Sequence, residues 1–317
     1  MLAVIGNALG FACIIIVGWT ARRLHLVDRE VKRVLPNLML CITLPASIIS
    51  NCNGCKISPS DLYILGLGCL FNATALILAW IVGRRNHLSS FLMVSTAGFN
   101  IGCFAMPFVQ GMLPAQAVMQ ASLFDIGNSL MCLGLNYGIV AQAKEAETGG
   151  DGRLDVPKLL GVALRSVPVI AYLAMLALCL LRIELPVMLV NAAGIAGRAN
   201  PFIAMMVIGT SIEFVRKDDI GDGAGGRYGV VFKACALRLL HSAASAAVVV
   251  VLPLPAAVKC VVTCLVFAPI GAVSSVYAHR LRLDDGLAAC INSCYVPISI
   301  IAMSAVLAGS GMVVAGS

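Results

Sequence analysis

Long apolar runs without a single charge recur along the chain. Residues 1–21, 34–55, 62–83 and 260–278 contain no Asp, Glu, Lys or Arg. Each run is about twenty residues long, the length of α-helix that crosses the hydrocarbon core of a bilayer. The pattern predicts an all-α polytopic membrane protein. Ten transmembrane helices are predicted, at 2–21, 34–51, 61–83, 88–112, 115–142, 158–181, 186–215, 229–252, 256–278 and 286–309.

The positive residues between these spans predict how the chain is oriented. Fifteen Lys and Arg lie in the loops after the odd-numbered spans, whereas three lie in the loops after the even-numbered spans. Because positive loops stay in the cytoplasm, this bias predicts a multi-pass protein of the cell membrane, plasma or inner, with both termini outside. Five spans per half, in opposite orientations, predict two inverted repeats, 1–142 and 158–317, joined by a cytoplasmic linker at 143–157.

Composition and loop sequence exclude other classes of protein. Hydrophobic residues make up 60% of the chain and charged residues only 12%, whereas about a quarter of a soluble domain is charged. The net charge of +7 is scattered over short loops, so no continuous basic face for nucleic acid is expected. The run Gly221–Gly226 lacks the strand and the Lys-Ser/Thr of a phosphate loop, and we interpret it as a linker.

Thirteen cysteines are present, and most lie singly in apolar runs, where Cys behaves as a small hydrophobe. Cys52 and Cys55 stand apart because they share one loop region. They could form a metal site, a redox pair or a local disulfide, or they could be incidental. No His and no second Cys pair lies in the same loop, so no metal site and no cofactor are predicted.

Two predicted spans carry helix breakers at their centres. Pro removes a backbone donor and Gly lowers helix propensity, so both favour an unwound segment. Within a bilayer, unwound backbone belongs beside a cavity, and two breaks at equivalent positions of two repeats indicate a substrate site. A pair of ordinary proline kinks is the alternative. The candidate residues are Gly98, Asn100, Gly102 and Pro107 in one span, and Pro269, Gly271, Ser274 and Ser275 in the other.

Asp125 is the only charged residue between Arg85 and Lys144. It lies about 15 Å along the span at 115–142, counted at the helical rise. A carboxylate at that depth is costly and typical of ion or substrate pathways, which suggests that it carries a coupling proton. Asn128, one turn later on the same face, and Asn292 in the last span are the expected polar neighbours. A buried ion pair that only stabilises the bundle is the alternative.

Arg238 is comparably deep in the span at 229–252. Its guanidinium could bind a substrate carboxylate through two parallel hydrogen bonds, or it could pair with Asp125. Alternatively, the long side chain extends to the cytoplasmic surface. Arg198 looks central in the span at 186–215, and we interpret it as an anchor at the outer interface.

Several short motifs occur in an informative order along the spans. They are Leu44-Pro45-Ala46, Asn100-Ile101-Gly102 with Pro107 and Gly111, Ala121 to Asn128, Asn200-Pro201 through Gly209, Leu237-Arg238-Leu239, and Ala268-Pro269 with Tyr277. Their order and span placement resemble the auxin efflux carrier family over nearly the whole chain. The resemblance implies two inverted five-helix repeats whose fourth and ninth helices cross at their breaks. It also implies that Asn100, Pro107 and residues 269–275 line the substrate site.

The resemblance also bears on the substrate and the coupling ion. The family includes plant auxin exporters and bacterial permeases for malate or malonate. Many plant members have a long central cytoplasmic loop, whereas the loop predicted here at 143–157 is short, which favours the bacterial permease-like branch. The related bile acid:sodium symporters share the architecture, so sodium is an alternative coupling ion.

These patterns predict a secondary active transporter, a permease or efflux carrier, for a small organic anion, a carboxylate. It would work by alternating access with proton coupling. A sodium-coupled symporter and an anion channel are the alternatives, and no His-Glu-x-x-His or Gly-x-Ser-x-Gly motif indicates an enzyme. The expected partners are the anion and the lipid bilayer, with a homodimer left open and no nucleic acid. The expected substrate-binding residues are Asn100, Gly102, Pro107, Arg238, Pro269, Ser274 and Ser275, and the expected coupling residues are Asp125, Asn128 and Asn292.

Overall fold

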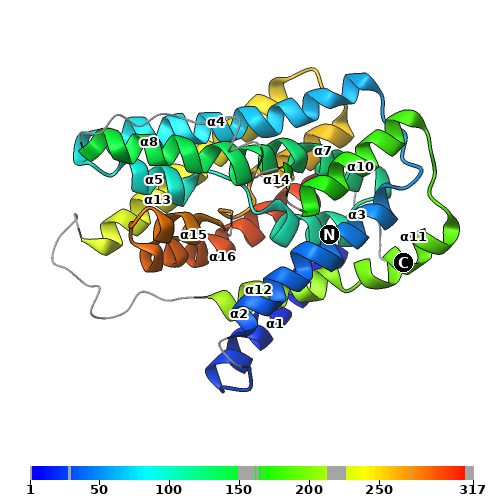
Figure 1. The fold of residues 1–317 in the computed structure, drawn as a ribbon, viewed down its shortest axis with the longest axis horizontal. Coiled ribbons are helices and arrows are strands. Elements are labelled where there is room, and N and C mark those ends of the chain that lie inside the picture. Colours follow the sequence, from blue (N-terminus) through cyan, green and yellow to red (C-terminus); the bar gives the residue numbers. More distant parts are fainter. Residues whose placement is uncertain are drawn as a thin grey trace.

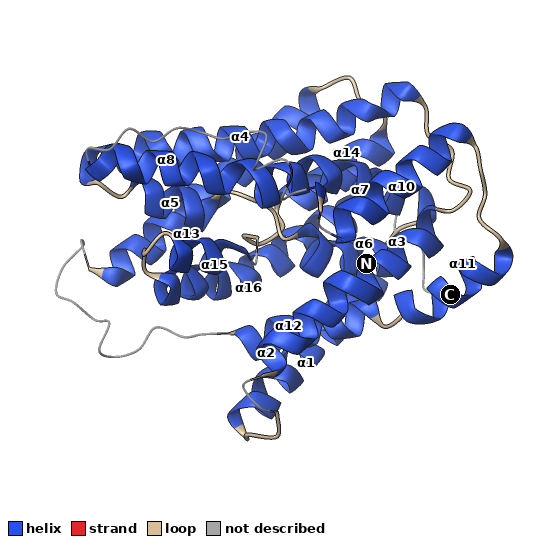
Figure 2. Ribbon diagram, in the orientation of Figure 1, coloured by secondary structure: helices blue, strands red, loops and turns tan. Residues whose placement is uncertain are grey.

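The computed structural model describes residues 2–27, 30–148, 161, 164–165, 167–212, 226–271 and 273–310. Within these ranges every regular element is a helix, and no strand occurs (Figure 2). Apolar runs of the length found here favour this outcome, because a helix satisfies all of its own backbone hydrogen bonds inside a membrane. The all-α prediction is therefore confirmed for the described part of the chain.

The first half contains α1 (Leu2–Arg23), α2 (Val31–Leu38), the π-helix η1 (Met39–Thr43), α3 (Leu44–Cys52), the 3₁₀-helix η2 (Pro59–Leu62), α4 (Tyr63–Gly83), the 3₁₀-helix η3 (Arg84–Asn86), α5 (Ser89–Thr96), the π-helix η4 (Ile101–Ala105), α6 (Met106–Met112), α7 (Ala115–Leu130), the π-helix η5 (Met131–Leu135) and α8 (Asn136–Thr148). The second half contains α10 (Val167–Leu181), α11 (Val187–Gly197), α12 (Asn200–Ser211), α13 (Arg227–Val251), α14 (Ala256–Val266), α15 (Val273–Arg280) and α16 (Asp285–Ser310).

Six helical segments among the described residues are long and apolar enough to cross a membrane. They are Val34–Cys52, Tyr63–Asn86, Ser89–Met112, Val187–Ser211, Arg227–Val251 and Asp285–Ser310. Two shorter apolar helices, Val167–Leu181 and Ala256–Val266, accompany them. These long apolar helices indicate a membrane-embedded protein.

The helices pack in two groups. The first group contains α1, α2, α3, α10, α11 and α12. In this group α1 and α2 contact α12, and α3 contacts α10 and α11. The second group contains α4 to α8 and α13 to α16. Figure 1 shows α1, α2 and α12 gathered at the bottom of the view. The groups meet where α3 and α10 contact α7, and where α1 and α12 contact α6.

Two glycines let α4 and α7 approach closely. A Cβ on Gly127 would lie 2.1 Å from the Leu65 carbonyl oxygen, and one on Gly68 would lie 2.3 Å from the Phe124 carbonyl oxygen. Small residues at a helix crossing allow this backbone approach within membranes. The result is that Asp125 and the following turn of α7 lie against α4.

The structure refines two predictions. The span predicted at 186–215 contains one apolar segment long enough to cross a membrane, Val187–Ser211, which a turn at Arg198 and Ala199 divides into α11 and α12. Pro201 lies in the first turn of α12, where a helix tolerates its missing N–H. Arg198 is exposed there. The linker predicted at 143–157 begins as helix, since α8 continues to Thr148. The remainder of that linker lies outside the described residues, as does most of the glycine run at 221–226.

Candidate functional site

Both predicted helix breaks are confirmed. Helix α5 ends at Thr96, and the four residues that follow are not helical. Gly98 in this segment has φ of +84°, a conformation that glycine adopts without a Cβ penalty. In the second half α14 ends at Val266, residues 267–271 lack regular structure, and α15 begins at Val273. Ala272, inside the predicted stretch, lies outside the described residues.

The two breaks touch each other through their backbones. The N–H of Asn100 donates a hydrogen bond of 2.8 Å to the carbonyl oxygen of Pro269. Pro107, the other predicted breaker, is buried in the first turn of α6. Segments separated by more than 150 residues in the sequence therefore share one point at the centre of the second helix group.

Arg238 joins both breaks from helix α13. Its Nη1 donates to the Thr96 carbonyl at 2.9 Å, and its Nη2 donates to the Ala268 carbonyl at 3.0 Å. These carbonyls lie at the end of α5 and just after α14, where helices leave carbonyls unpaired. The guanidinium carbon also lies 4.2 Å from the centre of the Phe99 ring, a cation–π arrangement.

The burial of Arg238 removes one of the predicted alternatives. The side chain is 0% exposed, so it does not extend to a membrane surface. Its terminal nitrogens hold carbonyls of the breaks, and Asp125 bonds to other groups, so the two residues are not an ion pair. The Nε of Arg238 is buried without a hydrogen-bond partner in the described structure. In this conformation Arg238 holds the two breaks together through its hydrogen bonds and places a positive charge beside them.

Asp125 accepts hydrogen bonds on both carboxylate oxygens. The hydroxyl of Tyr172 donates to Oδ2 at 2.6 Å, and Nδ2 of Asn128 donates to Oδ1 at 2.8 Å. Ser129 adds a long contact of 3.5 Å to Oδ1. The carboxylate is 3% exposed, and such burial is tolerable only with hydrogen-bond partners of this kind. Gly102 lies next to it, since a Cβ there would be 3.6 Å from Oδ2.

Asn128 connects Asp125 to the first break. Its Nδ2 donates to the Phe99 carbonyl at 2.9 Å, and the Phe99 N–H donates to its Oδ1 at 3.0 Å. Asn72 on α4 also donates to this Oδ1, at 3.1 Å. The amide thus pairs with both backbone groups of Phe99, as a neighbouring strand would, and fixes the unwound segment in one conformation.

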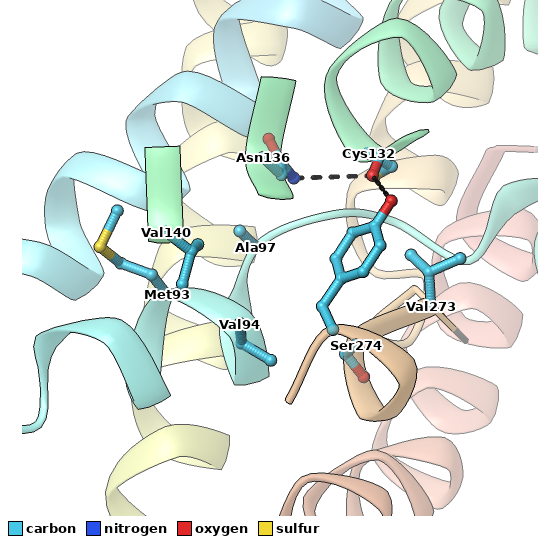
Figure 3. A pocket seen from close by; sticks show the side chains of 9 residues that line it. Met93, Val94, Ala97, Cys132, Asn136, Val140, Val273 and Ser274 are labelled. Carbon is cyan, nitrogen blue, oxygen red and sulfur yellow. Dashed lines mark hydrogen bonds between the residues drawn. The ribbon is translucent and has the colours of Figure 1, made fainter. Parts of the chain in front are cut away.

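A small, partly open pocket with room for about one water molecule lies beside the breaks (Figure 3). It is enclosed by the end of α5, the start of α15, and η5 with α8. The Tyr277 hydroxyl donates to the Cys132 carbonyl at 2.8 Å. In Figure 3 Asn136 is directed toward Cys132. The lining residues are Met93, Val94, Ala97, Cys132, Asn136, Val140, Val273, Ser274 and Tyr277.

The structure brings together part of the predicted site. Ser274 lines the pocket, and Asn100, Pro269 and Arg238 meet at the breaks beside it. Ser275 is half-buried on α15. Asn292 stays apart from Asp125, and its Oδ1 is buried without a hydrogen-bond partner in the described structure.

Sequence reasoning missed the partners of the charged residues. Tyr172 and Asn72 lie in strongly apolar helices, and neither belongs to a motif. Cys132 and Asn136 belong to a π-helical turn and the helix after it, where the register of an ideal α-helix no longer predicts which residues share a face. Tyr277 was identified only as part of the motif that begins at Ala268-Pro269, without a predicted role in the site.

The predicted loop pair of cysteines forms no disulfide. Cys52 and Cys55 are both free thiols. Cys52 is buried, with its sulfur 3.6 Å from the Ser122 hydroxyl. Among the residues described, no group of three or more His, Cys, Asp or Glu side chains could hold a metal ion.

Comparison with models of protein families gives no match, and comparison with curated proteins gives no similar sequence. Evidence about function therefore comes from the geometry at the breaks. That geometry joins two interrupted helices, a clamped arginine, a hydrogen-bonded carboxylate and a pocket between them.

Proposed function

We propose that this protein is a secondary active transporter of a small organic anion, a carboxylate, with ten spans in two inverted repeats. One observation carries the proposal: two interrupted helices meet at the bond from the Asn100 N–H to the Pro269 carbonyl. Broken helices that meet in mid-membrane are a recurring way to build a substrate site in transporters. Alternating access would come from movement of the two helix groups around this point.

The pocket provides neutral donors for a carboxylate. Helix α15 begins at Val273 on its wall, and the positive end of a helix dipole favours an anion. The Ser274 side chain adds a hydroxyl on the same wall. Arg238 adds a positive charge near the breaks, and its described hydrogen-bond partners are carbonyls rather than acids. This charge would favour an anion over a neutral ligand.

Asp125 is the proposed proton carrier. Its oxygens accept from a phenol, an amide and a hydroxyl. A sodium ion requires oxygen ligands, whereas these neighbours present hydrogens to the carboxylate, so the arrangement favours a proton over sodium as the coupling ion. By the predicted topology α5 and α15 form the cytoplasmic halves of their spans, so the pocket would receive substrate from the cytoplasm.

Purified protein tests the proposal in two stages. A thermal-shift screen over small organic acids identifies those that bind, with malate as the first candidate. Proteoliposomes loaded with unlabelled malate then take up radiolabelled malate if the protein is a carrier. Saturable counterflow is expected. Linear, non-saturable flux would indicate a channel, and a chemically altered product would indicate an enzyme.

One pair of variants tests the pocket itself. Val273→Trp fills the pocket from α15, whereas Val276→Trp adds the same bulk on the exposed side of the same helix. Counterflow should fall about tenfold or more in Val273→Trp, because the indole would occupy the space that the substrate needs. It should stay within about twofold in Val276→Trp. Equal activity of both variants would place the substrate elsewhere.

A further inference from the structure

We propose that Tyr172 is the group that lets Asp125 hold its coupling proton, because the hydrogen bond between the two side chains can reverse when the proton binds. This inference rests on the proposed function, since it identifies how the coupling residue is loaded. The phenol and the carboxylate are 1% and 3% exposed. Their oxygens are 2.6 Å apart. Tyr172 lies on α10 in the first helix group, and Asp125 lies on α7 in the second, so the bond crosses the boundary between the groups.

The two carboxylate oxygens differ in how they could accept a proton. Oδ1 faces Nδ2 of Asn128 at 2.8 Å, which can only donate, and the Ser129 hydroxyl lies farther away, at 3.5 Å. This amide cannot turn around, because its Oδ1 already accepts from the N–H of Phe99 and its Nδ2 donates to the Phe99 carbonyl. If the amide were reversed, its Nδ2 would face the N–H of Phe99 and its Oδ1 would face the carbonyl of Phe99, and both pairs would be repulsive. A proton on Oδ1 of Asp125 would therefore oppose a fixed donor.

Oδ2 faces a partner that can adapt. A phenol hydroxyl both donates and accepts, and its hydrogen rotates about the C–O bond. When a proton binds Oδ2, a new O–H bond forms on the carboxyl group and the carboxylate charge is neutralised. The Tyr172 hydrogen turns away, and the new O–H donates to the Tyr172 oxygen. The phenol stays neutral throughout, and only the direction of the hydrogen bond changes.

The other titratable groups near this pair are weaker partners. Cys103 from η4 and Cys132 from η5 lie within electrostatic range of Asp125, and Cys52 from α3 lies within range of Tyr172. Thiols are weak donors and weak acceptors. The charged group on α13, Arg238, is engaged by the two break carbonyls, and His241 on the same helix bonds to Thr74. Tyr172 is thus the strongest adaptable partner in the described surroundings.

Reversal of this hydrogen bond would couple protonation of Asp125 to movement of the first helix group. In the unprotonated state Tyr172 donates to a full negative charge, and such bonds are roughly twice as strong as neutral ones. After protonation the same contact joins two neutral groups. The attachment of α10 to α7 is therefore weaker when Asp125 carries its proton, so the first helix group can shift relative to the second.

Transport by the Tyr172→Phe variant gives the first test. Malate accumulation driven by a pH gradient should fall at least about tenfold, the effect of losing one hydrogen bond to a charged group. Malate counterflow at equal pH should stay within about twofold of wild type. Tyr63→Phe is the control, because it removes a phenol hydroxyl from an exposed position at the start of α4. Undiminished gradient-driven accumulation in Tyr172→Phe would overturn the inference.

Infrared spectroscopy tests the inference without any substrate and without the Tyr172→Phe variant. The pH-difference spectrum of the wild-type protein should contain a carboxylic C=O band that is absent in Asp125→Asn. A tyrosine band, identified with ring-deuterated tyrosine, should change in the same titration step. A carboxyl band that titrates without a tyrosine change, or that persists in Asp125→Asn, would overturn the inference. Failure of wild-type counterflow would instead count against the proposed function.

Discussion

Asn100 and Pro269 are joined by a backbone hydrogen bond of 2.8 Å, so the break in one half of the chain holds the break in the other half. The donor is a main-chain N–H, which leaves the Asn100 side chain outside this contact. That side chain is 8% exposed and forms no hydrogen bond within the described structure. A substitution of the Asn100 side chain can therefore change ligand binding and still keep the backbone bond between the two breaks.

Asn100→Ala should keep the contact between the breaks and lose the amide. We expect malate binding to weaken about ten- to hundredfold, as for the loss of one hydrogen bond to a charged ligand. The melting temperature should stay near wild type. Asn100→Pro is the contrasting variant, because the φ of −80° suits proline but the N–H is lost, which should cost about 1–3 kcal/mol of stability. Titration by thermal shift measures both effects, and wild-type affinity in Asn100→Ala would contradict this role.

Arg238→Gln should destabilise the protein before it affects binding selectively. The variant removes bonds to the carbonyls of Thr96 and Ala268, each worth about 1.5–3 kcal/mol because the donor is charged. Lys233→Gln removes a half-buried positive residue from the same helix and is the control. Thermal unfolding in detergent should show a large decrease only for Arg238→Gln. A stable Arg238→Gln protein that has lost malate binding would instead place the anion on the guanidinium.

Gly98→Ala should strain the first break. The residue has φ of +84°, and the new Cβ would lie 2.7 Å from the sulfur of Cys132. The left-handed conformation alone costs about 1–2 kcal/mol for an L-residue. Gly66→Ala is the matched control, because nothing lies within 4 Å of a Cβ there. Thermal unfolding should separate the two variants, and equal melting temperatures would argue against a rigid break.

Thiol labelling of intact cells tests the predicted orientation. Cys55 should react with an impermeant maleimide from outside, and Cys55→Ser should remove that signal. Burial raises the pKa of the Cys55 thiol, so the reactive thiolate is scarce near neutral pH and labelling should speed up as the pH rises. Asn86→Cys, exposed on η3, should react only after permeabilisation. Labelling of Asn86→Cys in intact cells would reverse the predicted topology.

The positions of the breaks were predictable because their causes are local. Pro107 lies in the first turn of α6 and does not interrupt it, whereas glycine at residue 98 and proline at residue 269 act on their own turns of the chain. The same holds for the apolar runs that form the long helices. The depth of Asp125 and Arg238 was also predictable, since depth follows from counting residues along a span.

The partners of these residues were not predictable, because partnership depends on rotation about the helix axis and on which helices are neighbours. The sequence left Arg238 with three options, and the structure shows a fourth, the carbonyls of two breaks. Tyr172 meets Asp125 only because α10 packs on α7. Three π-helical turns, Met39–Thr43, Ile101–Ala105 and Met131–Leu135, shift the helical register further, and none of them contains a proline that would have predicted the shift.

The pairing of Asn128 with Phe99 has a consequence for ligand hydration. Unwound backbone ordinarily holds water that a ligand must displace. Here the N–H and carbonyl of Phe99 and the carbonyls of Thr96, Ala268 and Pro269 are already bonded within the protein. A binding anion therefore loses its own hydration shell but removes none from these groups. Discrimination among organic acids should follow the free energy of dehydrating each acid, so weakly hydrated anions enter at lower cost than strongly hydrated ones of similar shape.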